Sequence, residues 1–116
     1  MVPERRASQR FRTYLPVRVY KTHTPQVIET LTKNLSMGGL RCISSTVCPV
    51  TTEVNVELVL TPGSEVLDLR GRTVWFQMIP HSDQYDLGIA FLDLPEENKR
   101  RLSAYIDHLS YQTASV

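Results

Sequence analysis

Residues 53–60 read EVNVELVL, and this stretch decides the fold class. Its apolar side chains stand at every second position, as Val54, Val56, Leu58 and Leu60. Because successive side chains of a strand point to opposite faces, this spacing predicts a β-strand with one buried face. The sequence TPGS follows directly, and its proline and glycine are typical of a tight turn.

Strand-like stretches separated by turn residues lie on both sides of this segment. Most are short, although the one at 66–79 is long, and their regular spacing favours a small antiparallel β-barrel. A kink or bulge is expected at Gly71, since glycine inside a strand often marks one. The predicted strands are YLPVRVYK at 14–21, QVIETLTK at 26–33, LRCIS at 40–44, VLDLRGRTVWFQMI at 66–79 and YDLGIAFLDL at 85–94.

The periodicity changes after the last predicted strand. Pro95 can occupy a first helical position, and the acids that follow it, Glu96 and Glu97, suit the positive end of a helix dipole. The apolar residues beyond them recur with helical spacing, which predicts a C-terminal amphipathic helix. The expected organisation is an arginine-rich arm at 1–12, a barrel at 13–93 and a helix with a tail at 94–116. The apolar residues that form one stripe along the predicted helix are Leu102, Tyr105, Ile106 and Leu109.

Composition excludes several classes of protein. The 116 residues are 41% hydrophobic and 22% charged, with a formal net charge of only +1, so bulk charge does not favour a nucleic-acid polymer as partner. No apolar run approaches the ~20 residues that cross a membrane, and no signal peptide is recognisable. A cytoplasmic protein without membrane insertion is therefore expected.

Reactive side chains form no catalytic or metal-binding pattern. The three histidines are scattered, and Cys42 and Cys48 have no Cys or His nearby at metal-ligand spacing. A disulfide between them is possible, but two reduced cysteines, with Cys42 packed in a strand, are favoured in a chain of this length. No pairing of nucleophile and base can be assembled. We therefore expect no enzyme activity, no cofactor and no metal.

The N-terminal arm concentrates positive charge. Between Met1 and Lys21 there are six basic residues and a single acid, Glu4, although the whole chain is nearly neutral. Such a patch indicates a local anionic partner, and the competing interpretation is a solvated basic tail. The basic residues are Arg5, Arg6, Arg10, Arg12, Arg18 and Lys21.

Two short motifs are not explained by folding. Arg6 and Arg10 form R-x-x-x-R within ERRASQR, and Asn34, Ser36 and Gly39 form N-x-S-x-x-G within NLSMGG. Each motif alone is weak, because the first occurs by chance and the second could be turn chemistry. Their order and separation, followed by strands of a barrel, make the combination more specific.

This combination resembles the PilZ domain family over essentially the whole chain. ERRASQR is similar to the family's arginine motif, NLSMGGLRC to its (Asp/Asn)-x-Ser-x-x-Gly motif, and GRTVWF and YDLGIAFLDL to its later strands. The resemblance implies a mainly all-β fold, a six-stranded antiparallel barrel with a C-terminal α-helix. It also implies a bacterial receptor for the second messenger cyclic di-GMP that is not an enzyme.

The chemistry of the motif residues suits that ligand. An arginine fork can bind a phosphate or the O6/N7 edge of guanine, and its plane can stack on a base. Asn34 can meet a guanine edge and Ser36 can donate to a ligand oxygen. Gly38 and Gly39 permit positive φ and close approach of the backbone.

Three further residues define details of the expected site. The resemblance implies that Arg5, directly before the motif pair, accompanies binding of a stacked pair of ligands. Trp75 is interpreted either as barrel packing or as a ring that stacks on a base. Arg12 has no assigned role, and Arg41 is expected on the strand surface with Arg70 and Arg72.

The expected mechanism is ordering of the arm when the ligand neutralises its arginines, which a partner protein then reads. Motility and biofilm regulation are compatible outputs for the family. The alternative is a PilZ-like interaction module that binds no ligand. Single-stranded nucleic-acid binding is disfavoured, because aromatic residues make up only 8% of the chain and the basic cluster is confined to the arm.

Overall fold

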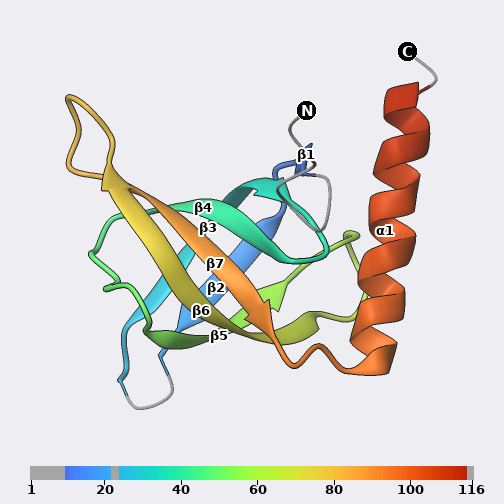
Figure 1. Cartoon of the computed structure of the whole chain (residues 1–116), viewed down its shortest axis with the longest axis horizontal. Coiled ribbons are helices and arrows are strands. Elements are labelled where there is room, and N and C mark those ends of the chain that lie inside the picture. Colours follow the sequence, from blue (N-terminus) through green and yellow to red (C-terminus); the bar gives the residue numbers. More distant parts are fainter. Residues whose placement is uncertain (1–9, 22–23, 115–116) are drawn as a thin grey trace, which may run out of the picture.

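The structure is a computed structural model that describes residues 10–21 and 24–114, with side chains as far as Leu109. Strands alternate with short turns along the first four-fifths of the chain, and one long helix ends it (Figure 1). The elements are β1 (Phe11–Arg12), β2 (Pro16–Tyr20), β3 (Val27–Leu35), β4 (Gly39–Ser44), β5 (Glu53–Leu58), β6 (Leu67–Met78), β7 (Tyr85–Leu92) and α1 (Glu96–Ala114).

The strands close into an antiparallel barrel. Their order is β1-β3-β2-β5-β6-β7-β4, and an additional pairing of β3 with β4 joins the two ends. Six strands form the barrel, as predicted, and the two-residue β1 adds a seventh at the side of β3. Closure leaves few open strand edges, which protects a small β-protein from unwanted pairing.

The barrel core follows the alternation in the sequence. Val54, Val56 and Leu58 of β5 are at most 3% exposed, while Glu53, the first residue of β5, faces solvent. The other barrel strands contribute in the same way, so each of the six barrel strands β2–β7 buries one face. The least exposed large side chains elsewhere are Leu35, Leu40, Leu67, Leu87 and Ile89.

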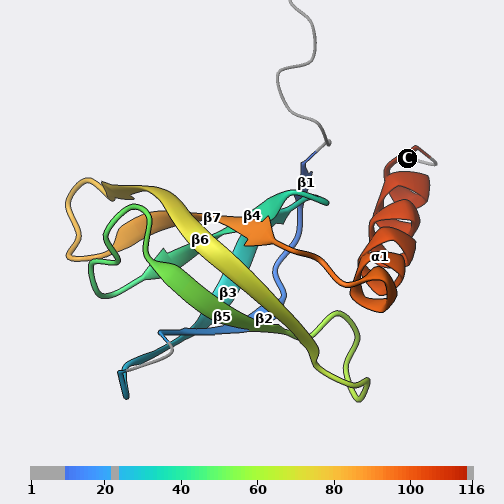
Figure 2. The ribbon, with the colours of Figure 1, turned by 60° about the horizontal axis from the view of Figure 1, so that its bottom comes forward.

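The helix α1 lies along one end of the barrel and contacts β1 and β6 (Figure 2). Leu102 is fully buried and Ile106 nearly so, which confirms the predicted apolar stripe. At the first turn, Asn98 donates to the backbone oxygen of Asp68 at 2.6 Å, so the helix start is tied to β6. No helix in the described part of the chain has the length and apolarity needed to cross a membrane.

The irregularity of β6 lies at a different place from the one predicted. Its register against β7 shifts between Thr73 and Trp75, not at Gly71. Gly71 is instead buried in regular pairing, where an added Cβ would lie 2.6 Å from Cγ2 of Ile89. The glycine therefore serves close packing rather than a change of strand direction.

Both cysteines are free and buried, as expected for reduced residues. Burial is the main cause that raises the pKa of the Cys42 thiol to about 12, and Cys48 and Asp86 add to the shift. The Sγ atom of Cys48 lies 3.2 Å from Oγ1 of Thr73. A thiol with so high a pKa is inert at neutral pH, so Cys42 has a packing role.

Replacing Thr32 with valine is expected to lower the free energy of unfolding by about 2–4 kcal/mol. The fully buried Thr32 hydroxyl donates to the backbone oxygen of Thr13 at 2.6 Å and accepts the backbone N–H of Leu15 at 2.9 Å. Valine leaves both backbone groups unpaired. Urea unfolding measures the loss, and Thr30→Val on the same strand is the control; equal stability of the two variants would contradict the prediction.

Candidate functional site

A bulge in β3 creates the candidate site on the outside of the barrel. The pairing of β3 with β4 shifts between Thr32 and Asn34, so an extra residue is inserted at Lys33. Such a bulge turns consecutive side chains toward the same surface. Lys33 and Asn34 both line one groove as a result.

The short strand β1 carries the end of the arm to this bulge. Arg12 pairs with Asn34, and the backbone N–H of Thr13 donates to Lys33 O at 3.3 Å. Arg10 therefore lies within reach of the same strand, and its Nη1 donates to Oδ1 of Asn34 at 2.9 Å. The arginine motif and the N-x-S-x-x-G motif thus meet through a direct side-chain contact, although 24 residues separate them.

Cross-strand pairing extends this contact into a row. Arg12 of β1 pairs with Asn34 of β3, and Asn34 pairs with Arg41 of β4. Arg41 in turn pairs with Gly88 of β7, and Gly88 pairs with Trp75 of β6. Paired residues of neighbouring strands have side chains on the same face. The row therefore crosses five strands on the outer surface.

A groove of about 670 Å³ lies over this row. Its charged lining residues are all basic, and Tyr14, Asn34 and Trp75 supply the rest of the lining. Cations on a concave surface concentrate positive potential, which favours an anionic ligand. We call this feature the cationic groove. Its four basic residues are Arg10, Arg12, Lys33 and Arg41.

Asp86 of β7 anchors the floor of the cationic groove. Its Oδ2 accepts from Nη2 of Arg41 at 2.8 Å, and its Oδ1 accepts from Nζ of Lys33 at 3.1 Å. The carboxylate side chain is only 15% exposed. Burial would raise the pKa of Asp86, but the hydrogen bonds and charges of Arg41 and Lys33 outweigh burial and lower the pKa overall.

Arg41 also lies over the indole ring of Trp75. Its guanidinium carbon is 5.8 Å from the ring centroid, which is within range of a cation–π interaction. Gly88 makes room for the ring, because an added Cβ at this position would lie 2.3 Å from Nε1 of Trp75. The Nε of Arg41 is buried and has no hydrogen-bond partner. Asp86, Gly88 and Trp75 together hold the guanidinium in one place.

The remaining motif residues form the turn between β3 and β4. Ser36 is 3% exposed, and its hydroxyl accepts the backbone N–H of Gly38 at 3.1 Å and donates to Gly39 O at 3.3 Å. Gly38 and Gly39 could adopt positive φ, but among the glycines of the described residues it is Gly63 that does so. Gly39 is needed for close packing instead, since an added Cβ would lie 2.1 Å from Ile89 O.

The predicted site residues thus separate into groups. Arg10, Asn34 and Trp75 line the cationic groove, and Trp75 is 36% exposed instead of packed in the core. Ser36, Gly38 and Gly39 build the adjoining turn and are not among the lining residues. The predictions for Arg5 and Arg6 lie outside the described residues.

The sequence analysis missed several residues of the site. The sequence pattern places Arg41 on the strand surface and gives no function to Arg12, Lys33 or Asp86. Alternation could have placed Arg41 opposite the buried Leu40 and Cys42, on the outer face. It could not have revealed that Arg41 meets Asp86 and Trp75, which come from other strands.

The closed barrel and its cationic groove define a small β-barrel protein with a positively charged groove on its outer surface. Hydrogen-bond donors and aromatic faces dominate the groove, so it suits a ligand that is both phosphorylated and planar. Within residues 10–21 and 24–114, no group of three or more His, Cys, Asp or Glu side chains could hold a metal ion.

Comparison with protein families identifies the particular kind of barrel. The model of the PilZ domain matches residues 4–108, and the chain therefore belongs to the PilZ domain family. Comparison with curated proteins finds no match.

Solved structures share the fold at low sequence identity. The PilZ domain of YcgR from Escherichia coli, solved with c-di-GMP, has a TM-score of 0.75 and 16% identity, over 97% of this chain and 96% of that chain. The K. pneumonia MrkH–c-di-GMP complex has a TM-score of 0.82 and 17% identity, over 98% and 56%. The Bacillus subtilis inhibitor of motility MotI has a TM-score of 0.79 and 14% identity, over 97% and 53%. The chain therefore spans about half the length of MotI and MrkH.

Proposed function

We propose that this chain is a receptor that binds cyclic di-GMP in the cationic groove. The observation that carries the proposal is the row from Arg12 to Trp75, which puts arginines, an amide and an indole ring on one surface. Membership of the PilZ domain family and the c-di-GMP complexes of YcgR and MrkH support the same ligand. The function is binding and signalling, without catalysis and without a cofactor.

Each lining residue has a role that its chemistry suits. Arg10 and Arg12 bind phosphate oxygens or a guanine edge through their guanidinium forks. Trp75 provides a stacking face for a base, and Arg41 above it adds a second planar cation. Asn34 accepts from Arg10 through Oδ1, so its amide N–H groups are the ones that can donate to the ligand.

The turn residues support the site by fixing its shape. Ser36 and Gly39 close the turn through the backbone bond from Ser36 N to Gly39 O at 2.9 Å. Gly38 adds a second link, since its carbonyl accepts the backbone N–H of Phe91 at 2.9 Å. These bonds hold Asn34 at the start of the turn in the position where it meets Arg10.

The arm completes the site from its N-terminal side. Arg6 joins Arg10 as the other half of the arginine motif, and Arg5 accompanies a second ligand molecule stacked on the first. Titration calorimetry gives the stoichiometry directly, and a value of one ligand per chain would exclude the stacked pair.

The signal passes from the ordered arm to a partner protein in the bacterial cytoplasm, with motility or biofilm formation as the regulated process. The domain consists of the arm at 1–12, of which Phe11–Arg12 pair with β3, the barrel at 13–93 and the helix with its tail at 94–116. The alternative function is that of an interaction module that binds no nucleotide.

Replacing Arg10 with alanine is expected to weaken cyclic di-GMP binding by a factor of about 10 to 100. The change removes one cation of the groove and leaves Oδ1 of Asn34 without its donor. Titration calorimetry measures the dissociation constants of the native chain and the variant.

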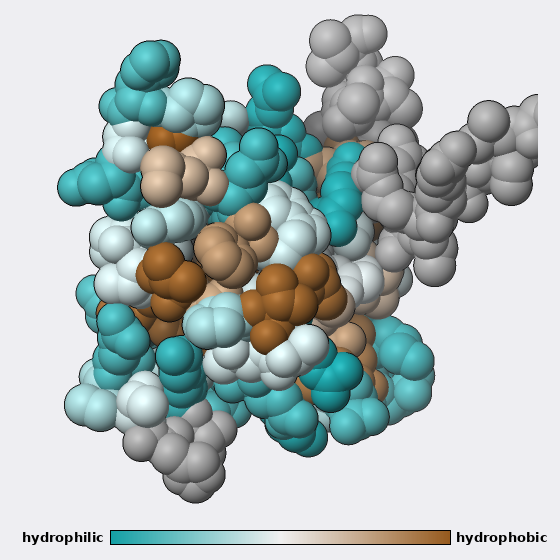
Figure 3. All heavy atoms as spheres, turned by 60° about the vertical axis from the view of Figure 1, so that its left-hand side comes forward, coloured by the Kyte–Doolittle hydropathy of each residue, from teal (hydrophilic) through white to brown (hydrophobic). Residues whose placement is uncertain are grey.

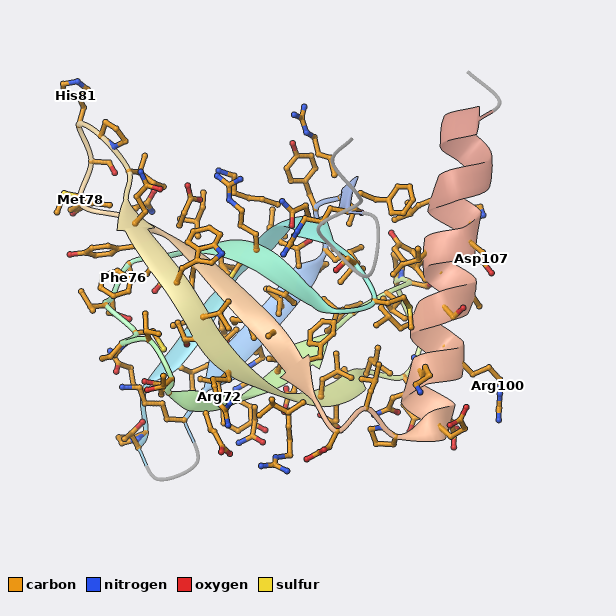
Figure 4. All side chains as sticks on the ribbon, in the orientation of Figure 1. Arg72, Phe76, Met78, His81, Arg100 and Asp107 are labelled. Atoms are coloured by element: carbon orange, nitrogen blue, oxygen red, sulfur yellow. The ribbon has the colours of Figure 1, made fainter. Side chains whose placement is uncertain are left out.

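Arg100→Ala is the matched control for this titration, because Arg100 is an exposed arginine on α1 (Figure 4) that is not among the lining residues of the groove. The control changes net charge equally and should bind like the native chain. Absence of heat from the native chain would instead favour the interaction module.

A further inference from the structure

The hairpin of β6 and β7 extends beyond the rest of the barrel (Figure 1). Strand β5 pairs with β6 from Leu67 to Arg72, and Thr73 then exchanges backbone bonds with Thr51 and Thr52. From Val74 onward, β6 has β7 on one side and no strand of the described chain on the other. Residues 74–78 are therefore an open strand edge.

The backbone of this edge is ready to pair. Ile79 N–H donates to Gln84 O at 2.9 Å across the hairpin, so Ile79 faces β7. Backbone groups of successive strand residues point to opposite sides. Phe76 and Met78 consequently turn their N–H and C=O groups to the open side, where no neighbouring strand satisfies them.

The side chains along the edge are apolar and exposed. Val74 is 45%, Phe76 38% and Met78 58% exposed, and residues 74–78 include no charged side chain. Figure 3 shows apolar side chains on this side of the molecule, and Figure 4 shows Phe76, Met78 and His81 on the hairpin, far from α1.

A second open edge in the same barrel carries the protection that this one lacks. Residues 27–31 of β3 pair with β2 alone, and the middle residue, Glu29, forms an ion pair with Arg18 at 3.1 Å. A charge on an exposed strand is a common means of preventing edge-to-edge association. The absence of any charge at 74–78 favours an edge that pairs with another strand.

We propose that residues 74–78 form a dimerisation edge that pairs antiparallel with the same edge of a second copy of this chain. The two-fold axis passes beside Gln77, so Phe76 of each copy exchanges backbone hydrogen bonds with Met78 of the other. The side chains of Phe76 and Met78 then lie beside each other across the interface.

Several features favour a second copy as the occupant. The register opposes apolar to apolar side chains and places Gln77 beside Gln77, with no charge facing another. In a two-fold dimer the same edge of each copy pairs with its counterpart, so neither copy has this edge left unpaired. The paired segment is short, and its interface falls below the ~1,000 Å² typical of stable complexes, so the dimer is weak and reversible.

Sedimentation velocity of the full chain without ligand, from low micromolar to near-millimolar protein, tests the proposal. The native chain should shift from monomer to dimer, and Met78→Lys should remain a monomer because it puts a charge into the pairing edge. Leu31→Lys is the control, since Leu31 is 51% exposed and lies on the other edge. Circular dichroism verifies that both variants fold.

A cysteine at position 77 tests the register. Opposed residues that do not share hydrogen bonds have Cα atoms about 4.5 Å apart, close enough for a disulfide. Gln77→Cys should form a covalent dimer on mild oxidation, whereas Gln84→Cys, an exposed site in the hairpin turn, should not, and the buried Cys42 and Cys48 do not compete.

Two results would overturn the proposal. In the first, the native chain sediments as a monomer at every concentration and Gln77→Cys forms no crosslink. The edge would then not pair with a second copy and could only serve another protein. The other is a dimer that persists in Met78→Lys, which would place the interface elsewhere. Neither result depends on whether the cationic groove binds cyclic di-GMP.

Discussion

Gly39→Ala is expected to destabilise the folded chain strongly. An added Cβ would lie 2.1 Å from Ile89 O and 3.2 Å from Cα of Ala90, so both clashes involve backbone atoms. Neither can be relieved by rotating a side chain, and β4 must move away from β7. We expect a loss of about 3–5 kcal/mol, a large part of the roughly 5–15 kcal/mol that stabilises a typical domain.

The effect is measured by urea unfolding, followed by circular dichroism and by the fluorescence of Trp75. Gly38→Ala is the matched control, because Gly38 is the neighbouring glycine, is exposed and has no positive φ. It should retain nearly native stability. A Gly39→Ala variant within ~1 kcal/mol of the native protein would show that β4 and β7 can separate more easily than the contacts indicate.

Alternation in the sequence was sufficient to predict the barrel. The buried face of β5 and the apolar stripe of α1 come from local periodicity, which reports how each segment meets a core. The number of barrel strands and the final helix could be predicted for the same reason. Local patterns could not predict features that depend on contacts between strands. The bulge predicted at Gly71 is wrong because this glycine packs against Ile89 of a different strand.

The candidate site was harder to predict than the fold, because its residues meet through strand register. Asn34 and Arg10 could be chosen from motifs, but the partners of Arg41 come from β6 and β7. A shift of β4 by one residue against its neighbours would send Arg41 to the core face. The bulge that exposes both Lys33 and Asn34 has no clear signature in KNLSMGG.

Arg41→Ala is expected to weaken cyclic di-GMP binding by a factor of about 10 to 100 if the proposed function is correct. The change removes a cation from the floor of the cationic groove and frees the Trp75 ring from the guanidinium above it. Arg41→Lys should also bind more weakly than the native chain, because lysine keeps the charge but has neither the planar fork nor the stacking surface.

Arg72→Ala is the control for this titration, because Arg72 is an exposed arginine of β6 that is not among the lining residues of the groove. Full affinity in Arg41→Lys would mean that charge alone matters at this position. Full affinity in Arg41→Ala would exclude the floor of the groove from the binding site.

The pH dependence of stability gives an independent test of how Arg41 is held. The pKa of Asp86 is lowered in the folded state, so the stabilisation by its ion pairs is complete above its unfolded pKa of about 3.9. The stabilisation is lost as pH falls through the lower folded pKa.

Without Arg41, the pKa of Asp86 should rise, because burial opposes ionisation and only Lys33 remains to offset it. Urea unfolding from pH 7 to pH 3 should therefore show a smaller acid-induced loss in Arg41→Ala than in the native chain, and equal losses would mean that Arg41 and Asp86 are not coupled.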